Sequence, residues 1–249
     1  MTESNGGLQD ALTAVQDAFH RVSGTGLHAL SNTADPLPRA ARLCVPIRSL
    51  GPSHRERIGL HLKNLNPHDR YLRFGYAAGD EQIDRYVEGL NFDRDDIFGV
   101  YNRKLELVAM AHLALNEDPQ YQDCAEFGVS VASQARGRGY GSRLFDRAVM
   151  HARNEGIGML FIHALSENTA MLHIASQAGA KVERDGSETE AYLKLPDATL
   201  DSRVTEMVEE QFAQADYRFK AQAMQFWDFL TTVQDIRRGV KNAQHAAAE

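Results

Sequence analysis

Residues 133–142 read SQARGRGYGS, a loop with glycine at every second position from 137 to 141. The loop follows a strand-like run over 125–131 and leads into an amphipathic helix over 142–155. Glycine lets the backbone turn its amide N–H groups inward because no Cβ stands in the way. Those amides lie at a helix N-terminus, where the helix dipole favours an anion, and two arginines add positive charge. The loop therefore predicts a pyrophosphate site.

Three kinds of phosphate-binding loop compete for this sequence. A nucleoside-triphosphate loop needs Lys and then Ser or Thr after its last glycine, whereas Gly141 is followed by Ser142 and Arg143. A dinucleotide-binding loop needs glycine at its first, third and sixth positions, and the sixth is not glycine whether the count starts at Gly137 or at Gly139. The third pattern, Arg/Gln-x-x-Gly-x-Gly/Ala between a strand and a helix, fits at every position.

This third pattern resembles the acetyl-CoA loop of the GCN5-related N-acetyltransferase (GNAT) superfamily. Residues 66–74 read NPHDRYLRF, similar to the S-P-x-D/S-R-Y-x-R-F segment of the branch that includes bacterial protein-lysine acetyltransferases. Residues 168–179 resemble the superfamily's Asn-led helix that follows the fifth strand. The resemblance covers about residues 42–195. It implies a GNAT-type α/β fold whose mixed, mostly antiparallel central sheet is covered by helices.

The bulk composition limits the class of protein. A chain of 249 residues with 43% hydrophobic residues can build one α/β domain with extensions, or two small domains. The net charge of −7 argues against general binding to nucleic acid or to anionic membranes. The opening residues do not resemble a secretory signal, and no apolar run reaches membrane-spanning length, so we expect a cytoplasmic protein. Cys44 and Cys124 lack metal-binding spacing, so we expect reduced core cysteines and no bound metal.

The order of elements follows from hydrophobic periodicity and from Gly and Pro punctuation. Residues 70–74 form a short aromatic-basic patch. The pattern predicts helices over 8–22, 54–64, 81–90, 142–155 and 168–178, and strands over 41–50, 96–101, 105–115, 123–131, 159–164, 180–185 and 190–195. Adjacent strands followed by strands that alternate with helices predict a mixed sheet covered by helices.

The chain divides into three parts at this level. Residues 1–40 are an N-terminal helical extension and loop, 41–196 the acetyltransferase-like domain, and 197–249 a C-terminal amphipathic helical extension. Apolar residues recur at threes and fours from Val204 to Val233, and such a stripe must be covered by something. It packs either on the domain itself, beside the 8–22 helix, or on a partner helix in a homodimer. The periodicity does not choose between them.

The resemblance implies where acetyl-CoA binds. The amides of residues 136–142 would hold the pyrophosphate, and strand residues 129–131 would pair with the pantetheine arm through backbone groups. Asn168 either hydrogen-bonds the pantetheine, as its family counterparts do, or is simply a helix N-cap. The expected cofactor-binding residues are Val129, Val131, Arg136, Gly137, Arg138, Gly139, Tyr140, Gly141, Ser142 and Asn168.

Transfer of an acetyl group to an amine needs an unprotonated amine, and a lysine-like amine is only about one part in a thousand neutral at pH 7. Glu126 is the candidate general base, since several lysine-acetylating relatives resemble this chain with Glu at the corresponding strand position. Alternation places it on one strand face with Gly128 and Ser130. An exposed or salt-bridged surface Glu is the other interpretation. For the oxyanion, the resemblance indicates the backbone N–H around Val129.

The group that protonates the departing thiolate is not apparent. Many relatives have Tyr seven residues after the Asn, where this chain has Ala175, so water or Ser176 would have to serve. His112 is a fallback base, although a mid-strand His is more often a core or surface residue. His163 and His173 have the same interpretation.

We therefore predict an acetyl-CoA-dependent N-acetyltransferase, an acyltransferase in which a primary amine attacks the thioester directly. The acceptor is a protein lysine, favoured slightly by residues 70–74, or a small amine. The alternative is a non-catalytic acyl-CoA-binding sensor, and it is favoured by Ala175, which stands where many relatives have tyrosine.

Overall fold

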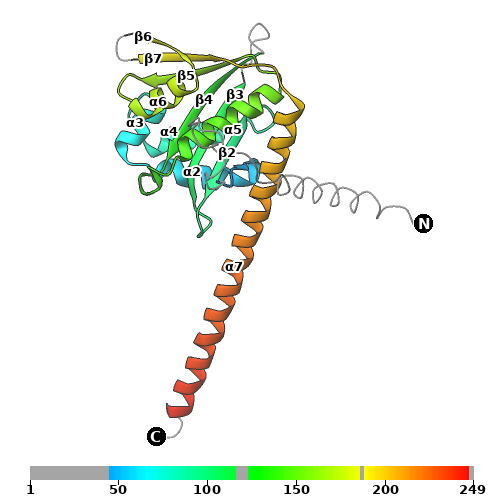
Figure 1. The fold of residues 1–249 in the computed structure, drawn as a ribbon. Helices are drawn as coiled ribbons and strands as arrows, with labels where there is room; N and C mark the ends of the chain where they lie inside the picture. The colour runs from blue at the N-terminus through cyan, green and yellow to red at the C-terminus, as the bar shows by residue number, and fades with distance from the viewer. Residues whose placement is uncertain (1–44, 116–122, 186–187, 247–249) are drawn as a thin grey trace, which may run out of the picture. The chain divides into compact units, whose positions relative to one another are not determined.

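The computed structural model describes residues 45–115, 123–185 and 188–246, which form a central sheet with helices on both faces (Figure 1). The predicted helix over 8–22 and the first domain boundary lie outside these residues. The strands are β1 (Arg48–Ser49), β2 (Asp96–Tyr101), β3 (Leu107–Leu115), β4 (Cys124–Val131), β5 (Met159–Leu165), β6 (Lys181–Asp185) and β7 (Glu188–Lys194). The helices are α2 (Arg55–Lys63), α3 (Pro67–Phe74), α4 (Asp80–Glu88), α5 (Tyr140–Asn154), α6 (Thr169–Gln177) and α7 (Leu200–Ala246).

The sheet has seven strands in the order β1-β2-β3-β4-β5-β7-β6. Every neighbouring pair is antiparallel except β4 and β5, which are parallel, so the predicted mixed, mostly antiparallel sheet is confirmed. The parallel pairing stops where Glu126 faces Phe161, although both strands continue. The backbone groups of β4 beyond Glu126 that point toward β5 therefore have no strand partner. This opening positions the site described below.

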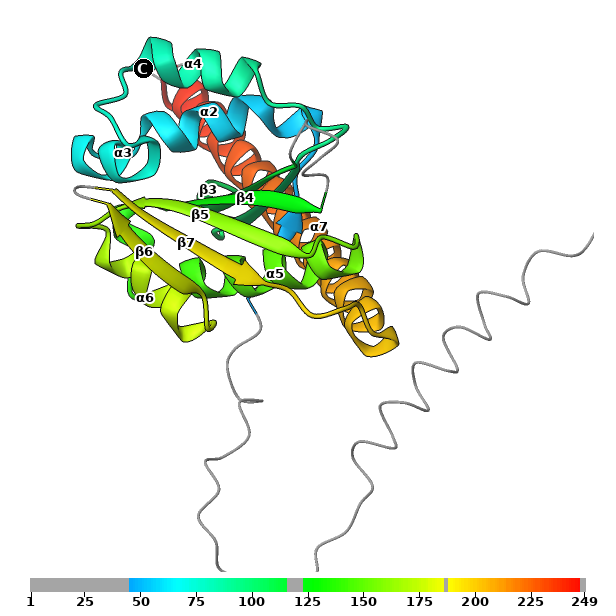
Figure 2. The same ribbon diagram turned by 90° about the horizontal axis from the view of Figure 1, so that it is seen from above.

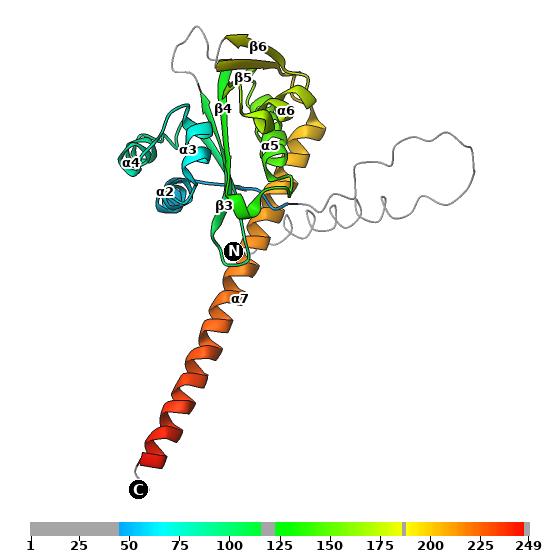
Figure 3. The same ribbon diagram turned by 90° about the vertical axis from the view of Figure 1, so that its left-hand side faces the viewer.

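Helices cover the sheet in two layers. Figures 2 and 3 show α2, α3 and α4 on one face, and α5 and α6 on the other. One core cluster lies under α5 and α6, where the rings of Phe127 and Phe145 meet edge to face at 5.0 Å. The second lies under α2 and α4 and includes Ile58, Ile83 and Met110. Cys124 is buried with a free thiol, as expected, whereas Cys44 lies outside the described residues.

Two local predictions are corrected at the start of the domain. Of the strand expected over 41–50, the described residues contain only β1, because Pro46 has no N–H to donate to a ladder. The patch at 70–74 is the second half of a helix, α3. Asn66 caps α3 by accepting a hydrogen bond from the Asp69 N–H at 2.8 Å. An Asn-Pro pair that ends one helix thus begins the next, with the proline at the first helical position.

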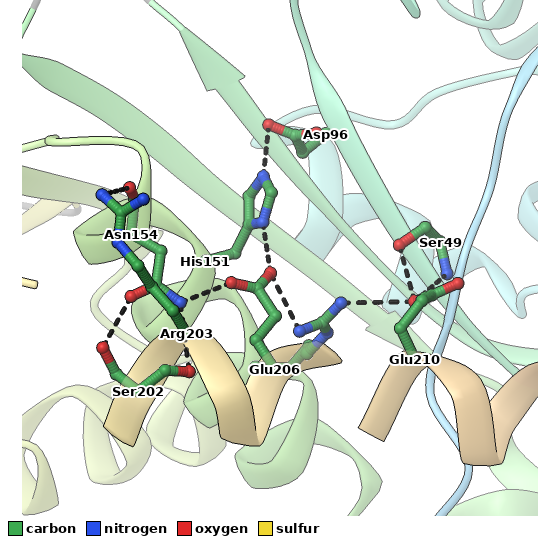
Figure 4. A network of polar contacts seen from close by, with 9 residues as sticks. Ser49, Asp96, His151, Asn154, Ser202, Arg203, Glu206 and Glu210 are labelled. Carbon is green, nitrogen blue, oxygen red and sulfur yellow. Dashed lines mark hydrogen bonds and ion pairs between the residues drawn. The ribbon is translucent and has the colours of Figure 1, made fainter. Parts of the chain in front are cut away.

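The C-terminal extension is a single helix of 47 residues, α7, and its polar side faces the domain. The guanidinium of Arg147, a side chain only 3% exposed, lies between Glu206 at 2.9 Å and Glu210 at 3.2 Å. The ring of His151 lies between Glu206 and Asp96, the latter at 3.0 Å (Figure 4). Charged and hydrogen-bonding groups therefore attach α7 to α5, and Glu210 also accepts a hydrogen bond from the Ser49 hydroxyl of β1 at 2.9 Å.

The apolar side of α7 faces away from the domain. Val204 and Val208 are each 60% exposed, and Phe219 is 73% exposed. We call Leu200, Val204, Met207, Val208, Phe212, Phe219 and Phe226 the outer stripe; all seven side chains are exposed. The outer stripe therefore does not pack on the described part of the domain, and the predicted packing beside the 8–22 helix lies outside the described residues. The sequence periodicity located the stripe, but the polar face of α7, opposite the stripe, contacts the domain.

Candidate active site

The glycine loop connects β4 to α5, as predicted, and its glycines serve two different needs. Gly137 and Gly139 have φ values of 72° and 74°, a left-handed conformation that residues with a Cβ rarely adopt. Gly141 lies in the first turn of α5 with an ordinary φ. A Cβ on Gly141 would lie 3.3 Å from the Cδ1 of Ile174 on α6, so this glycine allows α5 and α6 to approach closely.

The start of α5 presents free backbone donors. The N–H of Arg143 donates to the carbonyl of Gly139 at 3.1 Å, the first bond of the helix. The preceding N–H groups, from Tyr140 to Ser142, have no acceptor within the helix. Together with the positive end of the helix dipole they form a local anion site.

A cavity of about 470 Å³ lies over this loop. It is bounded by the loop, by residues 129–131 of β4, by α3 and by the start of α6. Nine of the ten predicted cofactor residues line it: Val129, Val131, Arg136, Gly137, Gly139, Tyr140, Gly141, Ser142 and Asn168. The tenth, Arg138, is exposed and is not among the lining residues.

Arg136 has a structural contact that the sequence did not reveal. Its N–H donates to the carbonyl of Ser133 at 3.3 Å, and its guanidinium forms an ion pair with Asp69 of α3. The hydroxyl of Ser133 also donates to Asp69 at 3.1 Å and accepts from Asn66 at 3.0 Å. Asp69 is buried, with 4% of its side chain exposed. These contacts, the α3–loop latch, fasten the glycine loop to α3.

Asn168 is an N-cap, since its side-chain oxygen accepts from the N–H of Met171 at 3.2 Å. Its amide group donates to the carbonyl of Leu72 at 3.5 Å, a long contact to α3. Asn168 is thus a helix N-cap, and it also lines the cavity in which the pantetheine arm was expected to bind.

Glu126 lies in a second cavity, of about 370 Å³. The two cavities share Leu72, Arg73, Val129, Asn168 and Met171, so they meet over β4 just where its pairing with β5 ends. Glu126 is exposed there and makes no hydrogen bond or ion pair with the described residues. Its carboxylate is therefore free to accept a proton from a ligand in this cavity.

His112 is not placed to act as a base. It lines neither cavity, and both ring nitrogens are engaged: Nδ1 with the hydroxyl of Tyr86 at 2.7 Å, and Nε2 with Asp95 at 3.2 Å. Burial and the charge of Arg73 lower the pKa of His112. His163 is an exposed residue of the second cavity, 3.6 Å from Glu190.

Neither Ala175 nor Ser176 is placed to act as the tyrosine that the resemblance led us to expect. Ala175 is fully buried in the core under α6, and Ser176 is exposed and lines neither cavity. His173 is exposed and borders the first cavity.

In the part of the chain that the structure describes, no cluster of three or more His, Cys, Asp or Glu residues is suited to a metal ion. Within the same ranges, no helix combines the length and hydrophobicity needed to cross a membrane.

Comparison with known proteins gives a consistent result. The model of the acetyltransferase (GNAT) family matches residues 64–180, which include both cavities' β4, loop and α6 residues. The GNAT domain of S. lividans PAT is similar over 60% of this chain and 89% of that chain, with a TM-score of 0.52 at 19% identity. A protein described as a candidate acetyltransferase from Acinetobacter baylyi ADP1 covers 60% and 93%, with a TM-score of 0.50 at 15% identity. No curated protein matches significantly. The likeness to these solved structures is one of fold, and the family model matches just under half of the chain.

Proposed function

We propose that this GNAT-fold protein is an acetyl-CoA-dependent N-acetyltransferase in which a primary amine attacks the thioester directly. The observation that carries the proposal is the junction of the two cavities over β4. The free amides at the start of α5 border one cavity, and Glu126, a carboxylate without an ion-pair partner among the described residues, borders the other. A thioester at the junction would meet an amine from the second cavity.

The first cavity suits coenzyme A. The amides from Gly137 to Ser142 would bind its pyrophosphate, and the positive end of α5 would stabilise the charge. The unpaired edge of β4 at Val129 and Val131 would hydrogen-bond the amides of the pantetheine arm, as an added strand does. Arg136 contributes indirectly, because the α3–loop latch holds the loop in place. Arg138, an exposed residue of the loop, would contact the nucleotide phosphates of coenzyme A from outside the cavity.

The second cavity suits the amine. In the proposed reaction the amine nitrogen attacks the carbonyl carbon, and its proton passes to Glu126, directly or through water. The tetrahedral intermediate then expels the thiolate, which takes a proton from solvent because Ala175 leaves no side-chain acid at that place. A thiol leaves readily, since its pKa is about 8.5. Glu190 adds negative charge to the cavity and favours a cationic acceptor.

The acceptor is a protein lysine or a small amine. Residues 66–74, which form α3 and its cap, favour the protein-lysine branch, because they border both cavities with the pattern that resembles it. The buried Ala175 favours the second candidate function, a sensor that binds acyl-CoA without turnover.

Two measurements on the same sample separate these functions. Calorimetry with acetyl-CoA measures binding, and release of free thiol with a panel of lysine peptides, polyamines and aminoglycosides measures turnover. We expect binding together with amine-dependent thiol release. Binding without release by any amine would favour the sensor, and absence of binding would refute both.

We also infer that the protein is a homodimer that buries the outer stripe of α7. A whole phenylalanine side chain presents roughly 150–250 Å², and the three in the outer stripe are 47% to 73% exposed. Together with the four aliphatic and methionine side chains, the stripe offers several hundred Å² of apolar surface, at the upper end of what a monomer usually exposes. Two such stripes would bury about as much area as a standard stable interface. The spacing of three and four residues is that of paired helices, and a two-fold axis would cover both stripes at once.

A further inference from the structure

Arg73, in the last turn of α3, occupies the junction between the two cavities. Its guanidinium lies against β4 at Gly128, where a Cβ would come within 2.7 Å of the guanidinium Cζ and Nη2. Gly128 does not have a positive φ, so its backbone conformation does not require glycine. The lack of a side chain makes room for Arg73. The positive charge is thereby brought onto the strand between Glu126 and Val129.

A chain of hydrogen bonds holds this guanidinium. Arg73 donates from Nη2 to the hydroxyl oxygen of Tyr86 at 2.8 Å, and the Tyr86 hydroxyl contacts Nδ1 of His112 at 2.7 Å. Nε2 of His112 contacts Asp95 at 3.2 Å, and Asp95 also accepts from Arg94 at 2.9 Å. An arginine can only donate, so Tyr86 must send its own proton to His112, which in turn donates from Nε2 to the carboxylate. Each hydrogen bond in the chain therefore has a fixed donor and acceptor, and Tyr86, His112 and Asp95 together fix the position of the Arg73 guanidinium.

The guanidinium of Arg73 also lies over the rings of Phe74 and Tyr86, at 5.3 and 5.4 Å, but its other N–H groups make no hydrogen bond with the described residues. Arg73 forms no ion pair with any described residue, and it lines both cavities. A guanidinium carries five N–H donors, and Tyr86 takes one of them. Gly128 precedes Val129, whose N–H is expected to donate a hydrogen bond to the thioester oxygen. A charged donor therefore lies one residue from the expected backbone donor.

We propose that Arg73 is a catalytic residue that stabilises the oxyanion of the tetrahedral intermediate, with Tyr86, His112 and Asp95 as its positioning residues. This inference rests on the proposed function. When the amine nitrogen attacks, the carbonyl π pair moves to oxygen, where it is met by N–H groups of Val129 and Arg73. The pair then returns, the C–S bond breaks, and the sulfur leaves with its bonding electrons. The proton of the amine goes to Glu126, so Arg73 gains and loses no proton.

The test compares Arg73→Gln with Arg85→Gln, an exposed arginine of α4 that borders neither cavity. Loss of one oxyanion donor typically lowers kcat about 100-fold, and we expect that loss for Arg73→Gln with little change in the KM of either substrate. Calorimetry should show unchanged affinity for coenzyme A. For Arg73→Ala, added guanidinium ions should restore part of kcat, which a purely structural role would not allow. Arg85→Gln should behave as wild type.

The positioning residues are tested with Tyr86→Phe, which keeps the ring and removes the hydroxyl. We expect kcat to fall about tenfold with unchanged KM, as for supporting residues behind a reactive group. Tyr76→Phe, on an exposed tyrosine, is the matched control. A raised amine KM with normal kcat in Arg73→Gln would make Arg73 an acceptor-binding residue and overturn the proposal. Unchanged kinetics would also overturn it, leaving the proposed function intact. A wild-type protein that binds acetyl-CoA but releases no thiol would refute both.

Discussion

Glu126 is a carboxylate within an otherwise apolar strand, and the surroundings of its side chain decide what it can do. The alternation of β4 predicted its face, and the structure adds that it lies in a cavity without a cationic partner among the described residues. A carboxylate in that position can accept a proton but is not needed for packing. Its removal should therefore affect chemistry more than stability.

We expect Glu126→Gln to lower kcat about 100-fold at pH 7, because the amine then loses its general base. The deficit should shrink as the pH approaches the pKa of the amine, since the neutral amine no longer has to be produced. The pH profile of kcat from thiol release measures this. Glu155→Gln, an exposed carboxylate beyond α5, is the control. A constant deficit at all pH values would argue against a base.

Gly139 can be compared with Gly51, because a Cβ at either position would meet no atom within 4 Å. Only Gly139 has a left-handed φ, so Gly139→Ala should cost about 1–2 kcal/mol of stability, whereas Gly51→Ala should cost almost nothing. The strained loop should also bind coenzyme A more weakly. Chemical denaturation and calorimetry measure the two effects. Equal stability of the two variants would show that the loop conformation is not strained by a Cβ.

At the scale of whole elements, the attachment of α7 depends on ionised groups. Burial alone would lower the pKa of His151, but its hydrogen bonds with Asp96 and Glu206 outweigh burial and raise the pKa to about 9. Burial would likewise raise the pKa of Glu206, yet His151, Asn154 and Arg147 lower it to about 2. The folded state thus holds His151 protonated well above its ordinary pKa of 6.5.

The stabilisation from His151 should be complete below pH 6.5 and should be lost as the pH rises to about 9, because the unfolded chain releases this proton first. We expect the Tm of the wild type to fall over that interval. In His151→Gln the Tm should be lower at pH 6 and nearly flat up to pH 9. Thermal melts in a series of buffers measure both. A wild-type slope that persists in the variant would assign the pH dependence to another group.

Regular elements were predictable from sequence wherever periodicity and local breakers agreed. Residues 96–101, 123–131 and 159–164 became strands nearly as predicted, and the glycine loop was found with its helix. α3 was missed because Asn66-Pro67 signals both a helix end and a helix start. The side of α7 that contacts the domain was not predictable, since buried ion pairs leave no apolar trace in a sequence.

The site shows the same division. Backbone-dependent positions such as Gly137 and Gly139 were predictable, because their residue type is itself the signal. Arg73, Tyr86 and His112 come from three different elements, and only the fold brings them together. The ion pair between Asp69 and Arg136 was not predictable either, because the two residues lie far apart in the sequence and Arg136 fits the pattern of the cofactor loop.

At the scale of the whole molecule, dimer formation is the property most open to direct measurement. We expect light scattering after size exclusion to give the mass of two chains for wild type and of one chain for a Val208→Glu, Phe219→Glu double variant. Charges on the outer stripe oppose burial between copies but leave the polar attachment to α5 in place. Coenzyme A affinity should therefore be retained.

Phe219→Leu is the control for this variant, because it keeps the stripe apolar and should remain dimeric. A wild-type chain that is monomeric across micromolar concentrations would contradict the dimer. Loss of coenzyme A binding in the charged variant would instead indicate that the substitutions damage the domain.

The α3–loop latch has a consequence for how the two substrates arrive. Asp69 belongs to the helix that borders the amine, and Arg136 belongs to the loop that would grip the diphosphate, so a rigid link joins the two ligands' walls. A ligand that orders one wall orders the other and so strengthens binding of the second ligand, and thermodynamic reciprocity makes this effect equal in both directions. We accordingly expect each substrate to lower the dissociation constant of the other by the same factor. Breaking the latch should weaken this mutual effect.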